Sequence, residues 1–259
     1  MTTVEHPTRA TSQYRESFFA VLIGFVLLFL LLDRTPSLVA GHDRTVGFLV
    51  ASSVLVVVAV SLDILLFRRT LPSTWRTLGF GRPELRTLVI TTLIGALMLG
   101  CFPVFSWATR ASFALPEDWV WILLRLFAVH GIAEEVLFRG FAFHNLRFGR
   151  TFGRAAWLSL LLFAIAHLYL LTYMPPILAL FATFLSLASA HPLAYLFERC
   201  NNTIWAPAVL HTQVHAISFF VIPEAFVVTA AIAWMTMWSL SVLLIYAFRK
   251  RLFSHNRAA

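Results

Sequence analysis

The stretch VGFLVASSVLVVVAVSLDILLF, residues 46–67, contains a single ionisable side chain, Asp63. A helix needs about 20 consecutive apolar residues to cross the hydrocarbon core of a bilayer, so this stretch is long enough to span a membrane. The rest of the chain has the same character, because 59% of its 259 residues are hydrophobic and 12% are charged. A typical soluble domain carries about twice that charged fraction. The sequence therefore predicts an all-α, polytopic membrane helix bundle.

We expect about eight transmembrane helices in a single integral membrane domain that covers residues 1–259. The first span follows Arg9 and Arg15 and lacks a clean small-x-small cleavage site, so an uncleaved anchor is favoured over a signal peptide. The fifth and sixth spans are joined so tightly that they can also be interpreted as one re-entrant pair. The predicted spans are residues 17–32, 46–67, 87–109, 119–143, 155–173, 175–197, 203–222 and 225–248.

The net charge of +8 is divided unevenly between the predicted loops. If the N-terminus is cytoplasmic, fifteen of the twenty Lys and Arg residues lie in cytoplasmic segments, and only Arg34, Arg44 and Arg110 lie in the outer loops. By the positive-inside rule, this bias places both termini in the cytoplasm. A nucleic-acid partner is not expected, because the arginines are spread over separate short loops without a compact basic domain. The expected partner is the lipid bilayer.

Two adjacent glutamates and an arginine lie inside the fourth predicted span, in GIAEEVLFRG, residues 131–140. Ionisable residues at the centre of a membrane helix are costly, so most of them face the bundle interior or an aqueous cavity. Glu135 and Arg139 are four residues apart and share a helix face, where they either lock helices together as a salt bridge or orient a site. Glu134 points about 100° away and has no cation nearby in the sequence. His130 shares its face one turn earlier and can tune it, but it is not part of the predicted mechanism. We expect Glu134 to be an acid–base group.

Histidines lie at a similar depth in two other predicted spans. His167 is in FAIAH of the fifth span, and His211 and His215 are in LHTQVH of the seventh, where their spacing of four places both on one helix face. Counting from the inner helix ends, the depth is roughly 14 Å for Glu134, 18 Å for His167, 12 Å for His211 and 18 Å for His215. Each histidine taken alone can equally be an interhelical hydrogen-bonding group. Together they predict a site in the cytoplasmic half of the bundle.

These motifs resemble those of the CAAX protease and bacteriocin-processing family, which includes CAAX prenyl endopeptidases that are glutamic intramembrane proteases. EEVLFRG resembles its E-E-x-x-x-R motif, FAIAH its F-x-x-x-H motif, and NTIWAPAVLHTQVH its third motif, with His211 at the histidine position. The resemblance covers residues 76–216 as a catalytic core, flanked by helices in 17–67 and 225–248. The chain departs from the pattern at His215, where the family usually has Asn or Asp.

The resemblance implies an intramembrane endopeptidase that uses glutamate-activated water, without a metal or other cofactor, to cleave a membrane-associated protein or peptide. It also implies a plasma-membrane protein of a bacterium or archaeon with its active site toward the cytoplasm. The oligomeric state and the substrate are not indicated. The implied catalytic residues are Glu134 and His167, which activate the water, His211 and His215, which stabilise the oxyanion, and Glu135 and Arg139, which orient the site.

Two other interpretations of the same residues stay open. Glu134, His167, His211 and His215 are of the types that bind Zn²⁺, so a zinc-dependent intramembrane hydrolase is the second enzymatic hypothesis, although the usual H-E-x-x-H motif is absent. The exchange at His215 also leaves room for a catalytically weakened scaffold or immunity-type membrane protein.

Overall fold

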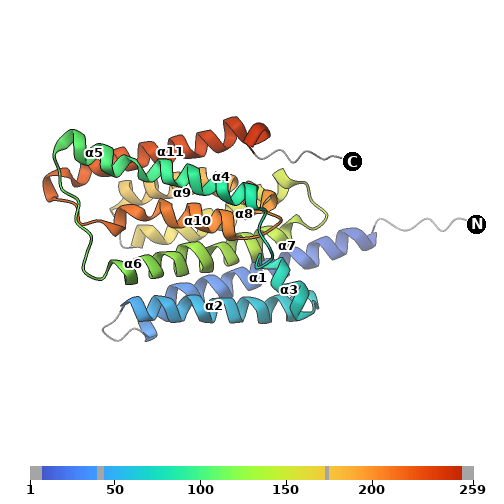
Figure 1. The fold of residues 1–259 in the computed structure, drawn as a ribbon. Helices are drawn as coiled ribbons and strands as arrows, with labels where there is room; N and C mark the ends of the chain where they lie inside the picture. The colour runs from blue at the N-terminus through green and yellow to red at the C-terminus, as the bar shows by residue number, and fades with distance from the viewer. Residues whose placement is uncertain (1–7, 40–43, 173–174, 253–259) are drawn as a thin grey trace, which may run out of the picture.

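The computed structural model describes residues 8–39, 44–172 and 175–252. Apart from one isolated bridge between Ala114 and Val221, the regular secondary structure of these residues is entirely helical, so the predicted all-α fold is confirmed. The long helices lie side by side, and α1 begins at the same end of the bundle at which α11 ends (Figure 1). The helices in chain order are α1 (Thr8–Val39), α2 (Arg44–Phe67), α3 (Leu71–Thr77), α4 (Leu85–Leu99), α5 (Cys101–Thr109), α6 (Trp119–Leu126), the π-helices η1 (Phe127–Ala133) and η2 (Val136–Phe143), α7 (His144–Arg147), α8 (Phe152–His167), the 3₁₀ helix η3 (Leu168–Thr172), α9 (Pro176–Arg199), α10 (Trp205–Val214), the 3₁₀ helices η4 (Ala216–Phe219) and η5 (Glu224–Phe226), and α11 (Val227–Leu252).

Five helical segments of the described chain are long and apolar enough to cross a membrane, judged by length and composition. At most 33% of the most apolar window of each segment is buried inside the bundle, so most of this apolar surface points outward. That arrangement suits a hydrocarbon solvent and not water, and the chain is an integral membrane protein. The predicted count of eight spans stays a prediction. The five segments are Phe18–Val39, Thr45–Phe67, Leu85–Thr109, Phe152–Thr172 and Glu224–Lys250.

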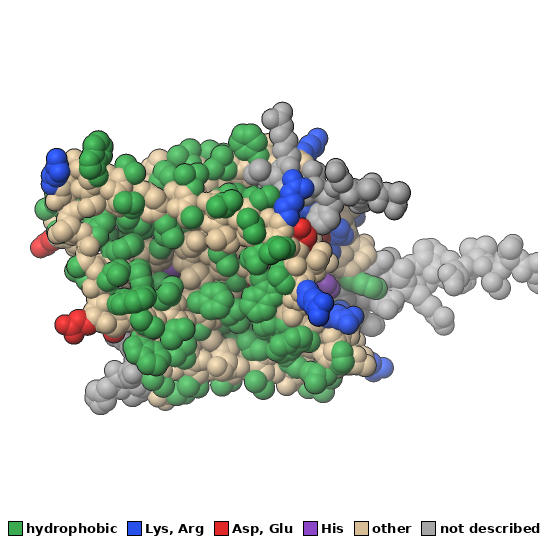
Figure 2. All heavy atoms as spheres, viewed as in Figure 1, with side chains coloured by type: hydrophobic (Ala, Val, Ile, Leu, Met, Phe, Trp, Pro, Cys, Tyr) green, Lys and Arg blue, Asp and Glu red, His purple; other side chains and the backbone are tan. Residues whose placement is uncertain are grey.

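Charged side chains gather at the two ends of the bundle. Figure 2 shows hydrophobic side chains across the middle of the visible face, with most Lys and Arg at one end and most of the visible Asp and Glu at the other. We call the first the arginine-rich end, where α3 and α7 lie (Figure 1), and the second the acidic end. The arginine-rich end carries Arg68, Arg69, Arg76, Arg82, Arg86, Arg147, Arg150, Arg154, Arg199, Arg249 and Lys250, and the acidic end carries Asp33, Glu117, Asp118 and Glu224 beside Arg34 and Arg110.

The fourth predicted span is one continuous helix over residues 119–147, wound partly as the π-helices η1 and η2. Two of its glycines permit very close neighbours. A Cβ atom on Gly131 would lie 2.6 Å from Thr212 Oγ1 in α10, and a Cβ on Gly140 would lie 2.5 Å from the carbonyl oxygen of Leu78. This helix therefore packs against α10, and against the segment that follows α3, more closely than a larger residue would allow.

The predicted seventh span, residues 203–222, is wrong in length. The helix α10 ends at Val214, whose carbonyl oxygen accepts a hydrogen bond of 3.2 Å from Trp234 Nε1 of α11. His215 follows as the C-cap residue and is not part of the helix. The third predicted span is likewise divided, at Gly100, into α4 and α5.

Two clusters of buried apolar side chains hold the helices together. The first joins α1 and α2 to η2, α7 and α8, and the second joins α4 and α5 to α10 and α11, while α9 contributes to both. The helix that carries Glu134 belongs to the first cluster, and α10, which carries His211, belongs to the second. The acid and imidazole groups therefore meet at the junction of the two clusters.

Asp63 forms a buried polar cluster near the arginine-rich end. Its side chain is fully buried, and its Oδ1 accepts hydrogen bonds from Arg69 Nη1 at 2.7 Å and from Asn145 Nδ2 at 3.2 Å. Asn145 Nδ2 also donates to the carbonyl oxygen of Phe141 at 2.8 Å. These bonds tie the end of α2 to the end of the helix that carries the glutamates.

Candidate active site

The adjacent glutamates lie where η1 meets η2, and their surroundings differ. Glu135 is fully buried, and its Oε1 accepts a hydrogen bond of 2.8 Å from Arg139 Nη1. The ion pair expected from their spacing of four residues is therefore present. The Glu134 side chain is 16% exposed and lines a cavity. Only Glu134 is placed to reach a molecule in that cavity.

Arg139 connects the glutamate helix to two neighbouring helices. Its Nη2 donates to the carbonyl oxygen of Ala190 in α9 at 3.4 Å, and its guanidinium lies 5.4 Å from the centre of the Phe163 ring in α8. The residue is only 2% exposed. Its contacts fit both interpretations open from the sequence, a salt bridge that locks helices together and a group that orients the site.

His211 of α10 lies between the two carboxylates. Its Nδ1 is 2.6 Å from Glu135 Oε1, and its Nε2 is 3.6 Å from Glu134 Oε2. A carboxylate only accepts hydrogen bonds, so the Nδ1–H group of His211 donates to Glu135. The distance to Glu134 is too long for a hydrogen bond. His211 thus bridges two acids that point in different directions from their helix.

His167 lines the same cavity as Glu134. Its Nδ1 lies 2.8 Å from the carbonyl oxygen of Phe163, one turn earlier in α8. Because a carbonyl oxygen only accepts, Nδ1 carries the proton. The Nε2 atom of the neutral ring then keeps its lone pair and can accept a proton.

His130 is the site residue that the predicted mechanism left out. Its Nδ1 lies 2.7 Å from Glu134 Oε1, so Glu134 has a hydrogen-bonding partner on its own helix. The spacing of four residues was the signal that could have found this bond. The His130 ring also stacks on that of His215, with centroids 3.5 Å apart and planes 7° apart. That contact joins the glutamate helix to the C-cap of α10, and no spacing within one helix predicts it.

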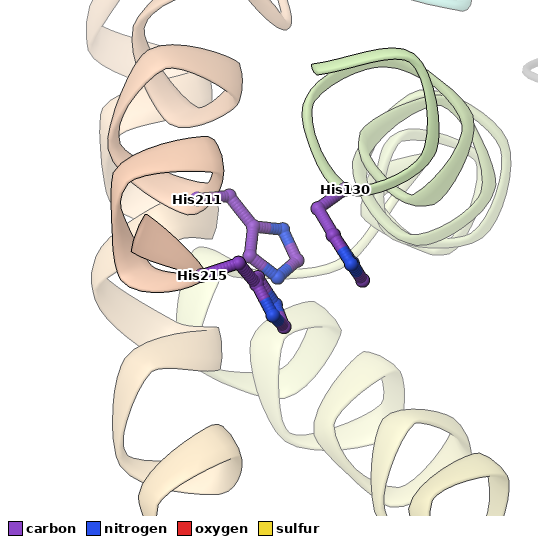
Figure 3. A group of neighbouring side chains, drawn as sticks. All are labelled: His130, His211 and His215. Carbon is purple, nitrogen blue, oxygen red and sulfur yellow. The ribbon is translucent and has the colours of Figure 1, made fainter. Parts of the chain in front are cut away.

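Three histidines converge in the space between these helices. Figure 3 shows His130 reaching from the glutamate helix toward His211 and His215, which extend from α10 and its C-cap. Each of the three offers a ring nitrogen, and these atoms lie within 4.8 Å of one another. The zinc ligands expected from the sequence were Glu134, His167, His211 and His215. The structure instead brings His130 into the converging group, and His167 is not a member.

The cavity beside these residues has a volume of about 1050 Å³, enough for a segment of peptide. It is lined by Glu134 and by four histidines, His130, His167, His211 and His215. Its walls are largely apolar and include Phe138, Trp234 and Trp238, while Asp33 and Arg125 contribute charge at its far end. Such a mixture of apolar walls and a few convergent polar groups is typical of ligand sites.

The cavity extends toward the acidic end. Besides the site residues, Asp33 and Ser37 of α1 and Ile217 and Ser218 of η4 line it. Within the described chain, no residue of the arginine-rich end does so. The sequence predicted both that the arginine-rich end is cytoplasmic and that the site opens toward the cytoplasm. A cavity that extends toward the acidic end does not support these two predictions together, and the orientation itself stays a prediction.

Glutamates on one helix thus meet histidines from two others in a cavity within an apolar helix bundle. Residues 116–217 match the protein-family model Rce1-like, described as type II CAAX prenyl endopeptidase Rce1-like. The resemblance predicted from the motifs is confirmed over this segment. The Rce1-like segment begins just before α6 and ends in η4, and α1, α2 and α11 lie outside it. The match implies a membrane endopeptidase. Comparisons of the chain with curated proteins and with solved structures found no match.

Proposed function

We propose that this protein is an intramembrane endopeptidase that cleaves a peptide bond in a membrane-associated protein or peptide with water activated by Glu134. One observation carries the proposal: Glu134 and His167, from different helices, line one cavity in an apolar bundle. Ionisable side chains inside a membrane bundle are costly and usually mark a functional site.

Water activation falls to Glu134 and His167. Glu134 Oε1 is occupied by His130, which leaves Oε2 as the atom that takes a proton from water. His167 holds its ring through the bond to Phe163, so its Nε2 lone pair is a second acceptor for the same water. A positioned general base contributes typically about 10²–10⁴-fold to the rate of such a step.

In this scheme His211 and His215 stabilise the negative charge that develops during cleavage. Because Nδ1–H of His211 is used by Glu135, the ring has a second N–H on Nε2 only as an imidazolium. The carboxylates of Glu134 and Glu135 on either side stabilise that charge. A cationic His211 and a donor from His215 then stabilise the oxyanion that forms on the scissile carbonyl. In this scheme Glu135 and Arg139 are positioning residues.

We further propose that the arginine-rich end faces the cytoplasm, with both termini on that side of a plasma membrane. The catalytic core predicted over residues 76–216 and its flanking helices then form one domain. Because the cavity extends toward the acidic end, the peptide enters from that half of the bundle. This revises the expected access from the cytoplasmic side.

The test is the substitution Glu134→Gln, which keeps the shape of the side chain and removes its basicity. Membrane proteomes of cells with the wild-type protein, with the variant and with neither are compared for shortened membrane proteins. Shortened products should appear only with the wild type. Glu117→Gln, at an exposed acid of the acidic end, is the matched control and should behave as the wild type.

If Glu134→Gln leaves the same products at equal protein abundance, glutamate catalysis is wrong. A phenotype that survives the substitution without any cleaved neighbour would instead favour the scaffold or immunity-type alternative.

A further inference from the structure

The three converging histidines have a hydrogen-bonding pattern that water activation does not require. Two of them hold a carboxylate through Nδ1: His130 is bonded to Glu134 at 2.7 Å and His211 to Glu135 at 2.6 Å. In the neutral rings, each Nδ1 carries the proton and each Nε2 carries a lone pair. His215 adds a third imidazole, whose ring lies 5.4 Å from that of His211.

This pattern is the one in which proteins present histidine to a metal ion. A metal-binding histidine almost always donates its other ring N–H to a carboxylate or a carbonyl, which fixes the tautomer and the ring orientation. Glu134 and Glu135 already provide that support for His130 and His211. Imidazole nitrogens suit Zn²⁺, Cu²⁺, Ni²⁺ and Co²⁺.

We propose that His130, His211 and His215 bind one divalent transition-metal cation such as Zn²⁺ in the cavity. Three protein ligands and an open fourth position are common for zinc. The cavity supplies room for a water molecule or a substrate atom at that fourth position. His130 belongs to none of the three motifs on which the family resemblance rests, so those motifs do not assign this ligand set.

The rings move when the ion binds. Zn–N bonds of about 2.0–2.1 Å in a tetrahedral site place neighbouring nitrogens about 3.4 Å apart, whereas the three ring nitrogens lie within 4.8 Å of one another. The stacked rings of His130 and His215 also rotate out of parallel, because a bound ion lies near the plane of each imidazole. Rotation of two side chains into an open cavity suffices for this change.

The bound ion also changes the proposed reaction, and this part rests on the proposed function. His211 and His215 are the groups assigned to stabilise the oxyanion. A ring nitrogen that binds the metal carries no proton, so it cannot donate a hydrogen bond to the oxyanion. Occupancy of the site therefore inhibits the metal-free hydrolysis. A cell that supplies the cation would in this way hold the protease inactive.

Binding is measured on the full chain in detergent micelles, without a polyhistidine tag and after treatment with a chelator. Co²⁺ is the probe, because its visible absorption reports coordination number, and Zn²⁺ is then added to displace it. We expect one Co²⁺ per chain with the spectrum of a four-coordinate ion. Loss of a residue that only supports a metal ligand typically lowers metal affinity roughly 10–100-fold. Because His130→Phe removes a ligand itself, it should lower the affinity for Co²⁺ by at least that factor.

His167→Gln is the matched control, because His167 lines the same cavity but is not one of the converging three. It should bind Co²⁺ like the wild type. His215→Asn, which introduces the residue usual in the family, is the second ligand variant, and thermal unfolding without metal shows whether each variant is folded. Wild-type affinity in folded His130→Phe and His215→Asn, or lost affinity in His167→Gln, would overturn the site.

Cleavage by the chelator-treated protein separates this inference from the proposed function. Cleavage without metal that falls as Zn²⁺ fills the site supports both. Cleavage that needs the added ion would overturn the inhibitory role and the metal-free mechanism, while the binding titration would still support the site. Absence of cleavage in every state, with one Co²⁺ bound, would count against the proposed function alone.

Discussion

His211 lies close to two glutamates that are neighbours in the chain but have different surroundings. Glu135 Oε1 accepts hydrogen bonds from both His211 and Arg139, and the side chain is fully buried, which fits the positioning role proposed for Glu135. Glu134 lines the cavity, and its Oε2 lies 3.6 Å from Nε2 of His211. Identical side chains at adjacent positions thus differ in role because of what surrounds each.

The Glu135–Arg139 pair predicts the response to a change at Arg139. Arg139→Met leaves a buried carboxylate without its guanidinium, and breaking a buried pair in this way costs roughly 3–5 kcal/mol. Unfolding of the purified protein in detergent, followed by heat or denaturant, measures the loss. The double variant Glu135→Gln/Arg139→Met removes both charges and should recover much of the stability. A single variant as stable as the wild type would show that the pair contributes little.

At the scale of elements, the glutamate helix is shaped by π-helical winding and by small residues. Both η1 and η2 are π-helical, and π-helical turns are often found at functional sites. Gly131 lets η1 approach α10, where Thr212 and the backbone of Ala208 lie against it. That close approach places His211 within reach of both glutamates.

Gly131→Ala should therefore impair the site. The added Cβ would lie 2.6 Å from Thr212 Oγ1 and 2.9 Å from the Phe127 ring, so η1 and α10 separate or the side chains shift. Overpacking of this kind costs about 1–3 kcal/mol, and we expect cleavage to fall because His211 moves away from Glu134. Product formation and unfolding temperature are the measurements. Gly153→Ala is the control, since a Cβ there meets nothing within 4 Å. Equal effects of the two substitutions would contradict the argument.

At the scale of the whole molecule, the basic residues and the cavity lie toward opposite ends of the bundle. Basic residues gather at the end where α3 and α7 lie (Figures 1 and 2). The cavity extends toward the acidic end. If basic residues set the orientation, the site is reached from the side opposite to the cytoplasm. Orientation is therefore the property on which the direction of substrate entry depends.

Cysteine labelling of intact cells tests this orientation. Both natural cysteines, Cys101 and Cys200, are buried, so introduced ones report without interference. A membrane-impermeant maleimide should label Ser37→Cys, which is exposed beside the cavity at the acidic end, and should reach Arg154→Cys only after the membranes are opened. The reverse pattern would place the arginine-rich end outside. It would thereby reinstate access to the site from the cytoplasm.

Local patterns predicted a good part of this molecule. The all-α fold follows from long apolar stretches, and the Glu135–Arg139 bond follows from a spacing of four residues along one helix. The burial of Asp63 was not predicted, because its partner Asn145 lies 82 residues away in the chain. The stacking of His130 on His215 was missed for the same reason.

By itself, the sequence determined that this chain lies in a membrane as helices and that its candidate catalytic groups lie in three of the predicted spans. Hydrophobicity and helical periodicity are local properties, so they can be summed along the chain without knowledge of its partners. Only the tertiary structure decided which imidazole meets which carboxylate and toward which end the cavity extends. Those outcomes depend on how closely glycine-lined helices pack, and no single helix contains that information.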